Sequence, residues 1–205
     1  KASSGAGAHP FFVRLGDYPV DRGFEAARYC RWREAAADLA EALRRIPAAP
    51  SHVWRFQALF VLASGDTEEY RRRAATLLKR YQDSSSIDEM FGLGNLCSLA
   101  PDPVADHHRI VQFVEKVLDP QHSYRKITLG LAYYRAGRWQ DAVDCLEHME
   151  GRPAEAEPQC WPTLAMANHR LQRTAEAKRW LQKSNDWFES SMPTLLPRTH
   201  PWWVP

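Results

Sequence analysis

The sequence predicts an all-α fold, a right-handed solenoid of about five helix-turn-helix units, and three observations support this. Residues in the same local setting recur at steps of 35, 35, 37 and 35, at Ala35, Tyr70, Ala105, Ala142 and Ala177. A turn position stands five residues before each of these markers, at Cys30, Gly65, Ala100, Gly137 and Gln172. An apolar stripe at helical spacing follows each marker, except that it comes one residue late in the third unit. Because one helix pair cannot bury its own apolar face, such units must stack. The alternative is an ordinary helical bundle with accidental periodicity.

The first two units contain the parts that a packed helix pair needs. In the first, Gly23 and Trp32 precede the apolar stripe, and Pro47 stops the second helix. In the second, the stripe continues from Tyr70 through Ala74 and Leu77. Ser86, with a glutamate three residues later, predicts a capping box that opens the next helix.

The third unit departs from the pattern. Its stripe comes one residue late, which fits the longer step of 37 residues that follows, and consists of Ile110, Phe113, Val114, Val117 and Leu118. We interpret this as a register shift and not as a missing repeat.

The fourth unit is the clearest, and the fifth repeats it more loosely. The fourth has the spacing of the tetratricopeptide consensus in Leu129, Gly130, Tyr133, Gly137, Trp139, Ala142 and Leu146. The fifth supplies Trp161, Leu164, Ala165, Ala177 and Leu181. Gly130 and Ala142 permit close helix contact. The array therefore resembles tetratricopeptide repeat regions, which implies stacked helical hairpins and a protein or peptide partner.

A more specific resemblance covers about residues 20 to 188. The stretches that carry it are 29–39, 54–55, 62–66, 70–72, 77–81, 99–106, 128–130, 134–139 and 164–171. They are similar to helical regions of large planctomycete regulatory proteins, where such an array commonly lies C-terminal to a serine/threonine kinase domain. The resemblance implies a bacterial scaffold or sensor appendage. It implies no catalysis, because the chain has no HRD, DFG or glycine-rich nucleotide motif. The last residues, MPTLLPRTHPWWVP, differ from the charged helix that usually follows in that family.

Composition agrees with one elongated domain. The 205 residues are 44% hydrophobic and 25% charged, and no run of 18 apolar residues occurs. The first ten residues have neither an initiator methionine nor the apolar stretch of a secretory signal, so we expect a segment excised from something longer. We expect an extended or linker segment at 1–18, the repeat domain at 19–191 and a Pro/Trp-rich tail at 192–205.

Charge and reactive residues do not favour catalysis, metal or nucleic acid. The net charge is +2, and Glu68 and Glu69 lie one turn from the basic cluster at 71–73, which indicates a solvated helix face. Four cysteines without a CxxC pair indicate reduced thiols and the cytosol. The adjacent His107 and His108 diverge on a helix and cannot easily share one metal. We expect no enzyme activity, cofactor, metal, small-molecule substrate or membrane span.

The tail contains much apolar surface. Four prolines in fourteen residues argue against a regular helix over 192–205, while Trp202 and Trp203 need a place to pack. We expect the tail to fold back over Trp180, Leu181, Trp187 and Phe188, because a terminal repeat needs a cap. The alternative is a docking peptide for a partner.

We expect a partner to bind the concave surface formed by the first helix of each unit. The predicted contact residues are Phe24, Arg28, Arg55, Phe56, Phe91, Tyr134, Arg135, His169 and Arg170, with apolar positions at Leu59, Met90, Gly94, Leu131 and Met166. The arginines suit a carboxylate or phosphate, and the aromatics suit an adjacent side chain. The alternative is that each arginine pairs within the array and each aromatic belongs to the core. The chaperone-tail clamp is set aside, because its positions hold Val20, Phe24, Arg55, Leu59, Ile127 and Leu131.

Two functions follow from these features. The first is a non-catalytic interaction module that recruits a protein or peptide to a larger regulatory protein. The second is a structural subunit or spacer in an assembly, with contacts through its tail and edges.

Overall fold

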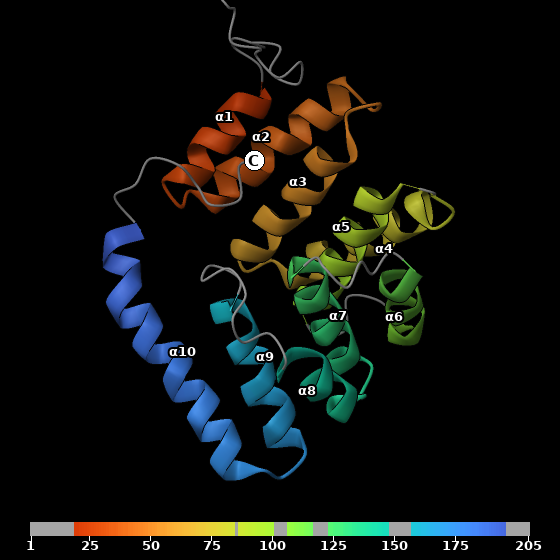
Figure 1. Ribbon diagram of the computed structural model, residues 1–205. Coiled ribbons are helices and arrows are strands. Elements are labelled where there is room, and N and C mark those ends of the chain that lie inside the picture. Colours follow the sequence, from red (N-terminus) through yellow and green to blue (C-terminus); the bar gives the residue numbers. More distant parts are fainter. Residues whose placement is uncertain (1–18, 85, 101–105, 117–122, 148–156, 196–205) are drawn as a thin grey trace, which may run out of the picture.

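The computed structural model describes residues 19–84, 86–100, 106–116, 123–147 and 157–195. Ten helices lie in this part of the chain and no strand does, which confirms the all-α prediction (Figure 1). The helices follow one another in five pairs: α1 (Pro19–Arg28) and α2 (Trp32–Arg45), α3 (Ser51–Ala63) and α4 (Thr67–Tyr81), α5 (Ile87–Leu99) and α6 (His107–Lys116), α7 (Ser123–Arg135) and α8 (Trp139–Glu147), α9 (Glu157–Arg170) and α10 (Thr174–Leu195).

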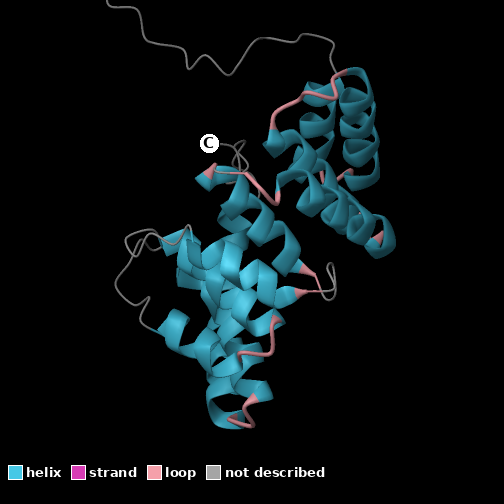
Figure 2. Cartoon of the chain, turned by 90° about the vertical axis from the view of Figure 1, so that its right-hand side faces the viewer, coloured by secondary structure: helices cyan, strands magenta, loops and turns pink. Residues whose placement is uncertain are grey.

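The pairs stack in chain order. Each first helix packs against its own second helix, and α2, α4, α6 and α8 also pack against the first helix of the next pair. The first helices α3, α5, α7 and α9 contact one another in sequence. Figure 2, turned by 90°, shows the same row of helices joined by loops. This is the predicted arrangement of about five helix-turn-helix units, in which burial comes from neighbours and not from one helix pair alone.

Four of the turns inside the pairs have the same backbone geometry. Cys30, Gly65, Gly137 and Gln172 have φ of 56°, 88°, 75° and 61°. In the first of these turns, the N–H of Cys30 donates to Ala27 O and the N–H of Arg31 donates to Ala26 O, both at 3.0 Å. The other three turns repeat both bonds at equivalent positions. This pattern is a Schellman motif, which closes the end of the first helix with backbone donors. The predicted turn positions are therefore confirmed at these four sites.

The third pair ends its first helix differently. Ala100 has an extended backbone, φ −113° and ψ 160°, where the other turns have positive φ. Ala100 precedes Pro101, and a residue before proline avoids helical conformations and favours extended ones. Pro101 also has no N–H, so it cannot supply the second bond of a Schellman motif. The period placed a turn here correctly, but the proline changes its conformation.

The marker of the third pair also differs from the prediction. In the other second helices the marker is the fourth residue, and it is buried at Ala35, Tyr70, Ala142 and Ala177. The fourth residue of α6 is Ile110, which is 1% exposed. Ile110 therefore takes the marker position five residues after Ala105. Ala105 itself lies outside the described residues, as do Val117 and Leu118 of the predicted stripe.

Glycines allow three of the first helices to approach their partners closely. A Cβ added at Gly23 would lie 3.0 Å from Leu39 Cγ. A Cβ added at Gly94 would lie 2.3 Å from Val114 Cγ2, and one added at Gly130 would lie 2.5 Å from Leu146 Cγ. Leu39, Val114 and Leu146 each follow their marker by one helical turn. The close contact predicted at Gly130 is thus present, and a side chain there would have to displace Leu146.

The buried side chains form two groups along the array. One runs from α1 to α7, and the other from α8 to α10, with the partly buried Tyr133 packed against both. The Gly130–Leu146 contact joins the two groups through α7 and α8. The core is therefore continuous along the row of helices, as a stacked array requires.

Two prolines lie inside helices near the end of the chain. Pro162 is within α9, and α10 continues through Pro193 to Leu195. The last helix thus includes residues 192–195, which we expected to belong to the tail. A proline removes one backbone donor; at Pro193 this loss falls in the last turn of α10, whereas Pro162 is the sixth residue of α9. Residues 196–205, with Trp202 and Trp203, lie outside the described residues, and no described helix could span a membrane.

Candidate protein-binding surface

The predicted binding surface consists of the first helices α1, α3, α5, α7 and α9. Phe24 of α1 meets α3 through ring contacts with Phe56 and Phe60, whose centroids lie 5.2 and 5.9 Å away. Phe24 and Phe56 are half-buried and pack against the core, as does Phe91 of α5. These aromatics therefore hold neighbouring helices together and leave only part of each ring to a partner.

Arg55 differs from the exposed Arg28 and Arg170 and from the hydrogen-bonded Arg135, because it is half-buried without a hydrogen bond or ion pair among the described residues. The Arg55 guanidinium carbon lies 5.7 Å from the centroid of the Phe56 ring. A Cβ on Gly92 of α5 would lie 1.8 Å from Arg55 Nη1, so the guanidinium occupies the space that the glycine leaves open. Burial lowers the pKa of Arg55, and the charge of Asp88 opposes that shift. The structure thus holds a partly desolvated cation between α3 and α5.

Arg135 is hydrogen-bonded within the array. Its Nε donates to Ser98 O at 2.9 Å and its Nη2 donates to Leu99 O at 3.0 Å. Both acceptors belong to the last turn of α5, which lacks the backbone donors of a Schellman motif. The guanidinium carbon also lies 5.6 Å from the Tyr134 ring centroid. Arg135 therefore joins α7 to the end of α5.

Tyr70 closes the same end of α5 from the other side. Its hydroxyl donates to Leu96 O, and burial raises the pKa of this tyrosine. The hydroxyl is thus a protonated donor beside carbonyls that the turn itself leaves open. The sequence shows Tyr70 only as a marker position, and nothing in its spacing points to Leu96, which belongs to the next pair.

The remaining predicted residues lie at the ends of their helices. Arg28 is exposed and its Nη1 lies 3.2 Å from Glu25 Oε2. His169 and Arg170 are exposed in the last turn of α9, and the Arg170 guanidinium carbon lies 5.9 Å from the Trp139 ring centroid. The structure does not bring these residues to Arg55. Two of the apolar positions, Met90 and Gly94, are buried, and Gly94 faces Val114 of α6 and not an open surface.

The histidines and cysteines form no metal cluster within the described residues. His107 is half-buried and His108 is exposed at the start of α6. All four cysteines are free thiols. Burial raises the pKa of Cys97 to about 12 and that of Cys145 to about 11, so both remain protonated at neutral pH.

Sequence reasoning did not find the relation of Arg55 to Gly92. A signal exists, because Gly92 and Gly94 stand two apart in one helix and both are unfavourable for helix formation. In the structure Gly94 takes the small position against Val114, as Gly23 does against Leu39, whereas Gly92 faces Arg55. An extra glycine outside the repeat pattern indicates that a neighbouring group needs its space.

Comparison with known proteins supports the fold. No family model matches the sequence, and no curated protein matches it. The structure is similar to TTC0263, a thermophilic tetratricopeptide repeat protein of Thermus thermophilus, with TM-score 0.56, 18% identity and coverage of 87% of this chain and 94% of that one. It is also similar to the nearly identical tetratricopeptide-like repeats of a putative kinesin light chain of Podosopora anserina, with TM-score 0.55, 16% identity and coverage of 86% and 99%. MamA of AMB-1 gives TM-score 0.50, 19% identity and coverage of 85% and 99%. The fold is therefore tetratricopeptide-like.

Proposed function

We propose that this chain is a non-catalytic protein-interaction module that binds an acidic group of its partner at Arg55. A tetratricopeptide-like array generally serves protein–protein interaction, and its stacked first helices offer an extended surface. The observation that carries the proposal is the half-buried Arg55 guanidinium without a hydrogen bond or ion pair among the described residues.

A carboxylate is the partner group that suits this site. Burial has removed part of the water around Arg55, so a carboxylate would supply charge-assisted hydrogen bonds that solvent does not fully provide. The half-buried Phe56 ring lies beside Arg55 and packs against Phe24, and it offers a surface to an adjacent apolar side chain. Arg28, Phe91, Tyr134, Arg135, His169 and Arg170 remain predicted contacts, with Arg135 limited by its bonds to α5.

Binding of acidic peptides to Arg55→Met tests this proposal. An array of peptides with and without a terminal or side-chain carboxylate is probed with the wild type, with Arg55→Met and with Arg44→Met. Arg44 is an exposed arginine of the second helix α2 and serves as the matched control. We expect Arg55→Met to lose the carboxylate-dependent signal and Arg44→Met to keep it. Equal binding by all three proteins would refute a role for Arg55.

The wider context of the module is a separate part of the proposal. The resemblance to helical regions of planctomycete regulatory proteins supports placement in a larger bacterial protein, C-terminal to a kinase domain, and the four free thiols suit the cytosol. The complete reading frame tests this directly, since a kinase domain should precede the first residue. A frame without one would remove the kinase association while leaving the interaction module unaffected.

A structural spacer is the second candidate, and the surface of α10 favours it. Leu181 and Phe188 are 53% and 51% exposed on this last helix. Either the tail at 196–205, with Trp202 and Trp203, or another protein can cover them. Deletion of 196–205 distinguishes the two functions. Lower thermal stability with unchanged assembly would make the tail a cap, whereas loss of assembly at unchanged stability would favour the spacer.

A further inference from the structure

A surface cavity of about 260 Å³ lies between α3 and α4, on a part of the molecule that the proposed function does not use. Trp54 and Gln57 of α3 line it from one side. The other side belongs to α4 and consists of Glu69, Arg72, Arg73, Thr76 and Leu77. At roughly 30 Å³ per water molecule, the space is larger than one bridging water would fill.

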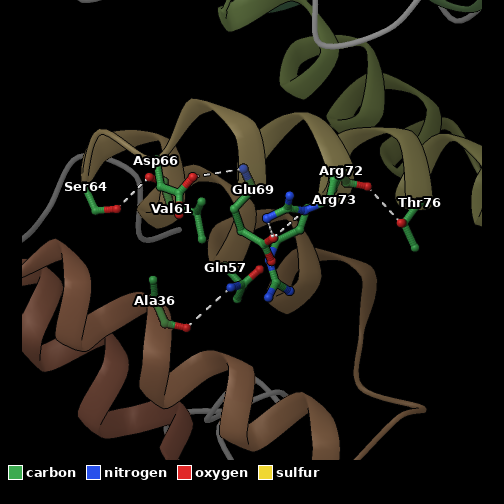
Figure 3. A network of polar contacts seen from close by, with 9 residues as sticks. All are labelled: Ala36, Gln57, Val61, Ser64, Asp66, Glu69, Arg72, Arg73 and Thr76. Carbon is green, nitrogen blue, oxygen red and sulfur yellow. Dashed lines mark hydrogen bonds and ion pairs between the residues drawn. The ribbon is translucent and has the colours of Figure 1, made fainter.

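Gln57 is the central group of this cavity. The residue is 1% exposed, and its Nε2 donates to Ala36 O of α2 at 3.4 Å. That carbonyl fixes the orientation of the amide, because the opposite orientation would place two oxygens together. Figure 3 shows the nitrogen directed to Ala36 and the oxygen directed toward the side chains of α4. Gln57 Oε1 is a buried acceptor with no donor among the described residues.

Trp54 supplies the complementary group. Its indole Nε1–H is buried and has no acceptor among the described residues. The Arg80 guanidinium carbon lies 4.7 Å from the centroid of the Trp54 ring, and Arg80 Nη2 donates to Pro47 O at 2.9 Å. These contacts fix the ring, so its donor is preorganised. Two residues that line one cavity thus carry a buried donor and a buried acceptor. Neither has a hydrogen-bond partner among the described residues, although buried polar groups are normally hydrogen-bonded.

Glu69 compensates one of the two arginine charges on the α4 wall of the cavity. Arg72 Nη2 and Arg73 Nε each lie 2.7 Å from a carboxylate oxygen of Glu69 (Figure 3). Thr76 Oγ1 donates to Arg72 O at 2.8 Å. The wall is thus an organised network with both donors and acceptors. Arg72 and Arg73 would attract an anion, but a carboxylate would leave the acceptor Gln57 Oε1 without a donor, whereas a neutral amide supplies one.

We propose that this cavity binds a carboxamide or peptide group of a protein partner, which accepts from Trp54 Nε1–H and donates to Gln57 Oε1. An uncharged amide is the common protein group that has both functions side by side. Binding here is independent of Arg55, which projects from the same helix toward α5. The cavity is thus a second contact surface, formed by α3 and α4.

The test follows the indole N–H resonance of Trp54 by NMR in the complete chain. The probes are N-acetylasparagine methylamide, N-acetylaspartate methylamide and sodium phosphate. Trp54→Phe identifies the resonance and keeps an aromatic ring for Arg80. We expect the asparagine probe to shift this resonance and to saturate, with the aspartate probe and phosphate giving no saturating shift.

Gln57→Met is the variant that removes the acceptor, and Gln112→Met on the exposed face of α6 is its matched control. We expect Gln57→Met to weaken asparagine-probe binding by about tenfold, since a buried hydrogen bond is lost, and Gln112→Met to leave it unchanged. Trp54→Phe should weaken binding likewise when measured through other resonances. A shift caused only by aspartate or phosphate, a shift that survives in Gln57→Met, or no shift with any probe would each overturn the proposal, the last leaving solvent as the occupant.

Discussion

The end of α5 differs from the ends of α1, α3, α7 and α9 in how its carbonyl groups are satisfied. Those four helices end in Schellman motifs at Cys30, Gly65, Gly137 and Gln172, which use backbone donors a few residues away. At α5, the donors are side chains from other pairs, the Tyr70 hydroxyl of α4 and the Arg135 guanidinium of α7. A helix end that uses backbone donors of its own turn does not depend on neighbouring pairs. The end of α5 instead depends on hydrogen bonds from α4 and α7, which connect the second, third and fourth pairs.

This difference has a consequence for stability along the array. In a solenoid, each unit normally interacts only with its nearest neighbours through packed faces. Tyr70 and Arg135 add polar bonds that span the second, third and fourth pairs. The middle of the chain should therefore unfold together with its neighbours and not as a separate unit.

The largest expected effect is that of Tyr70→Phe. The substitution keeps the ring but removes the hydroxyl, and it leaves the buried carbonyl of Leu96 without that donor. We expect a loss of about 1–3 kcal/mol in the free energy of unfolding, measured by urea denaturation. Tyr81→Phe is the control, because the Tyr81 hydroxyl has no hydrogen bond among the described residues. An equal midpoint for Tyr70→Phe and wild type would show that α5 does not depend on this bond.

The contrast between these turns also shows how far the sequence predicts the structure. The period predicts all five pairs and four of the turn conformations, because helical spacing and tight turns are local properties. The extended Ala100 was also predictable, since Pro101 follows it and restricts it directly. The hydrogen bonds donated by Tyr70 and Arg135 could not be predicted from the sequence, because 26 residues separate Tyr70 from Leu96 and 37 separate Arg135 from Ser98. Only the packing of pairs decides which side chain reaches that end.

The candidate sites follow the same rule. Arg55 is predicted as a surface residue by its place in the first helix of the second unit, but its lack of a partner depends on Gly92 of the next unit. The donor and acceptor at Trp54 and Gln57 become visible only when α2, α3 and α4 are placed together. The sequence therefore predicts which helix face a residue occupies better than it predicts which polar side chains lack a hydrogen-bond partner.

A smaller effect is expected for Arg135→Met. The change removes two hydrogen bonds to Ser98 and Leu99, the second of them exposed, and should cost about 1–2 kcal/mol. Because Arg135 and Tyr70 close the same helix end, the double variant should cost less than the sum of the single losses. Additive losses would mean that the two caps act separately.

Alkylation of Cys97 gives a second measurement for the same variant. Cys97 lies on α5, is fully buried, and has a pKa raised to about 12 by burial, so it should react only when α5 opens. We expect faster labelling of Cys97 in Arg135→Met and an unchanged rate in Arg44→Met. An unchanged labelling rate in both variants would show that the Arg135 hydrogen bonds do not control the opening of α5.

The smallest effects concern the turns that close locally. Cys30 and Gln172 hold positive φ without being glycine, so Cys30→Gly and Gln172→Gly should each stabilise the fold by about 0.5–1 kcal/mol, whereas Gly137→Ala should destabilise it by about 1 kcal/mol. Ala100→Gly provides the contrast, because an extended backbone gains nothing from glycine and the unfolded chain gains entropy. Denaturant midpoints at constant slope measure all four variants. A stabilised Ala100→Gly protein would mean that the third turn adopts the same left-handed geometry as the others. The distinction between helix ends closed by backbone donors and an end closed by side chains of other pairs would then fail.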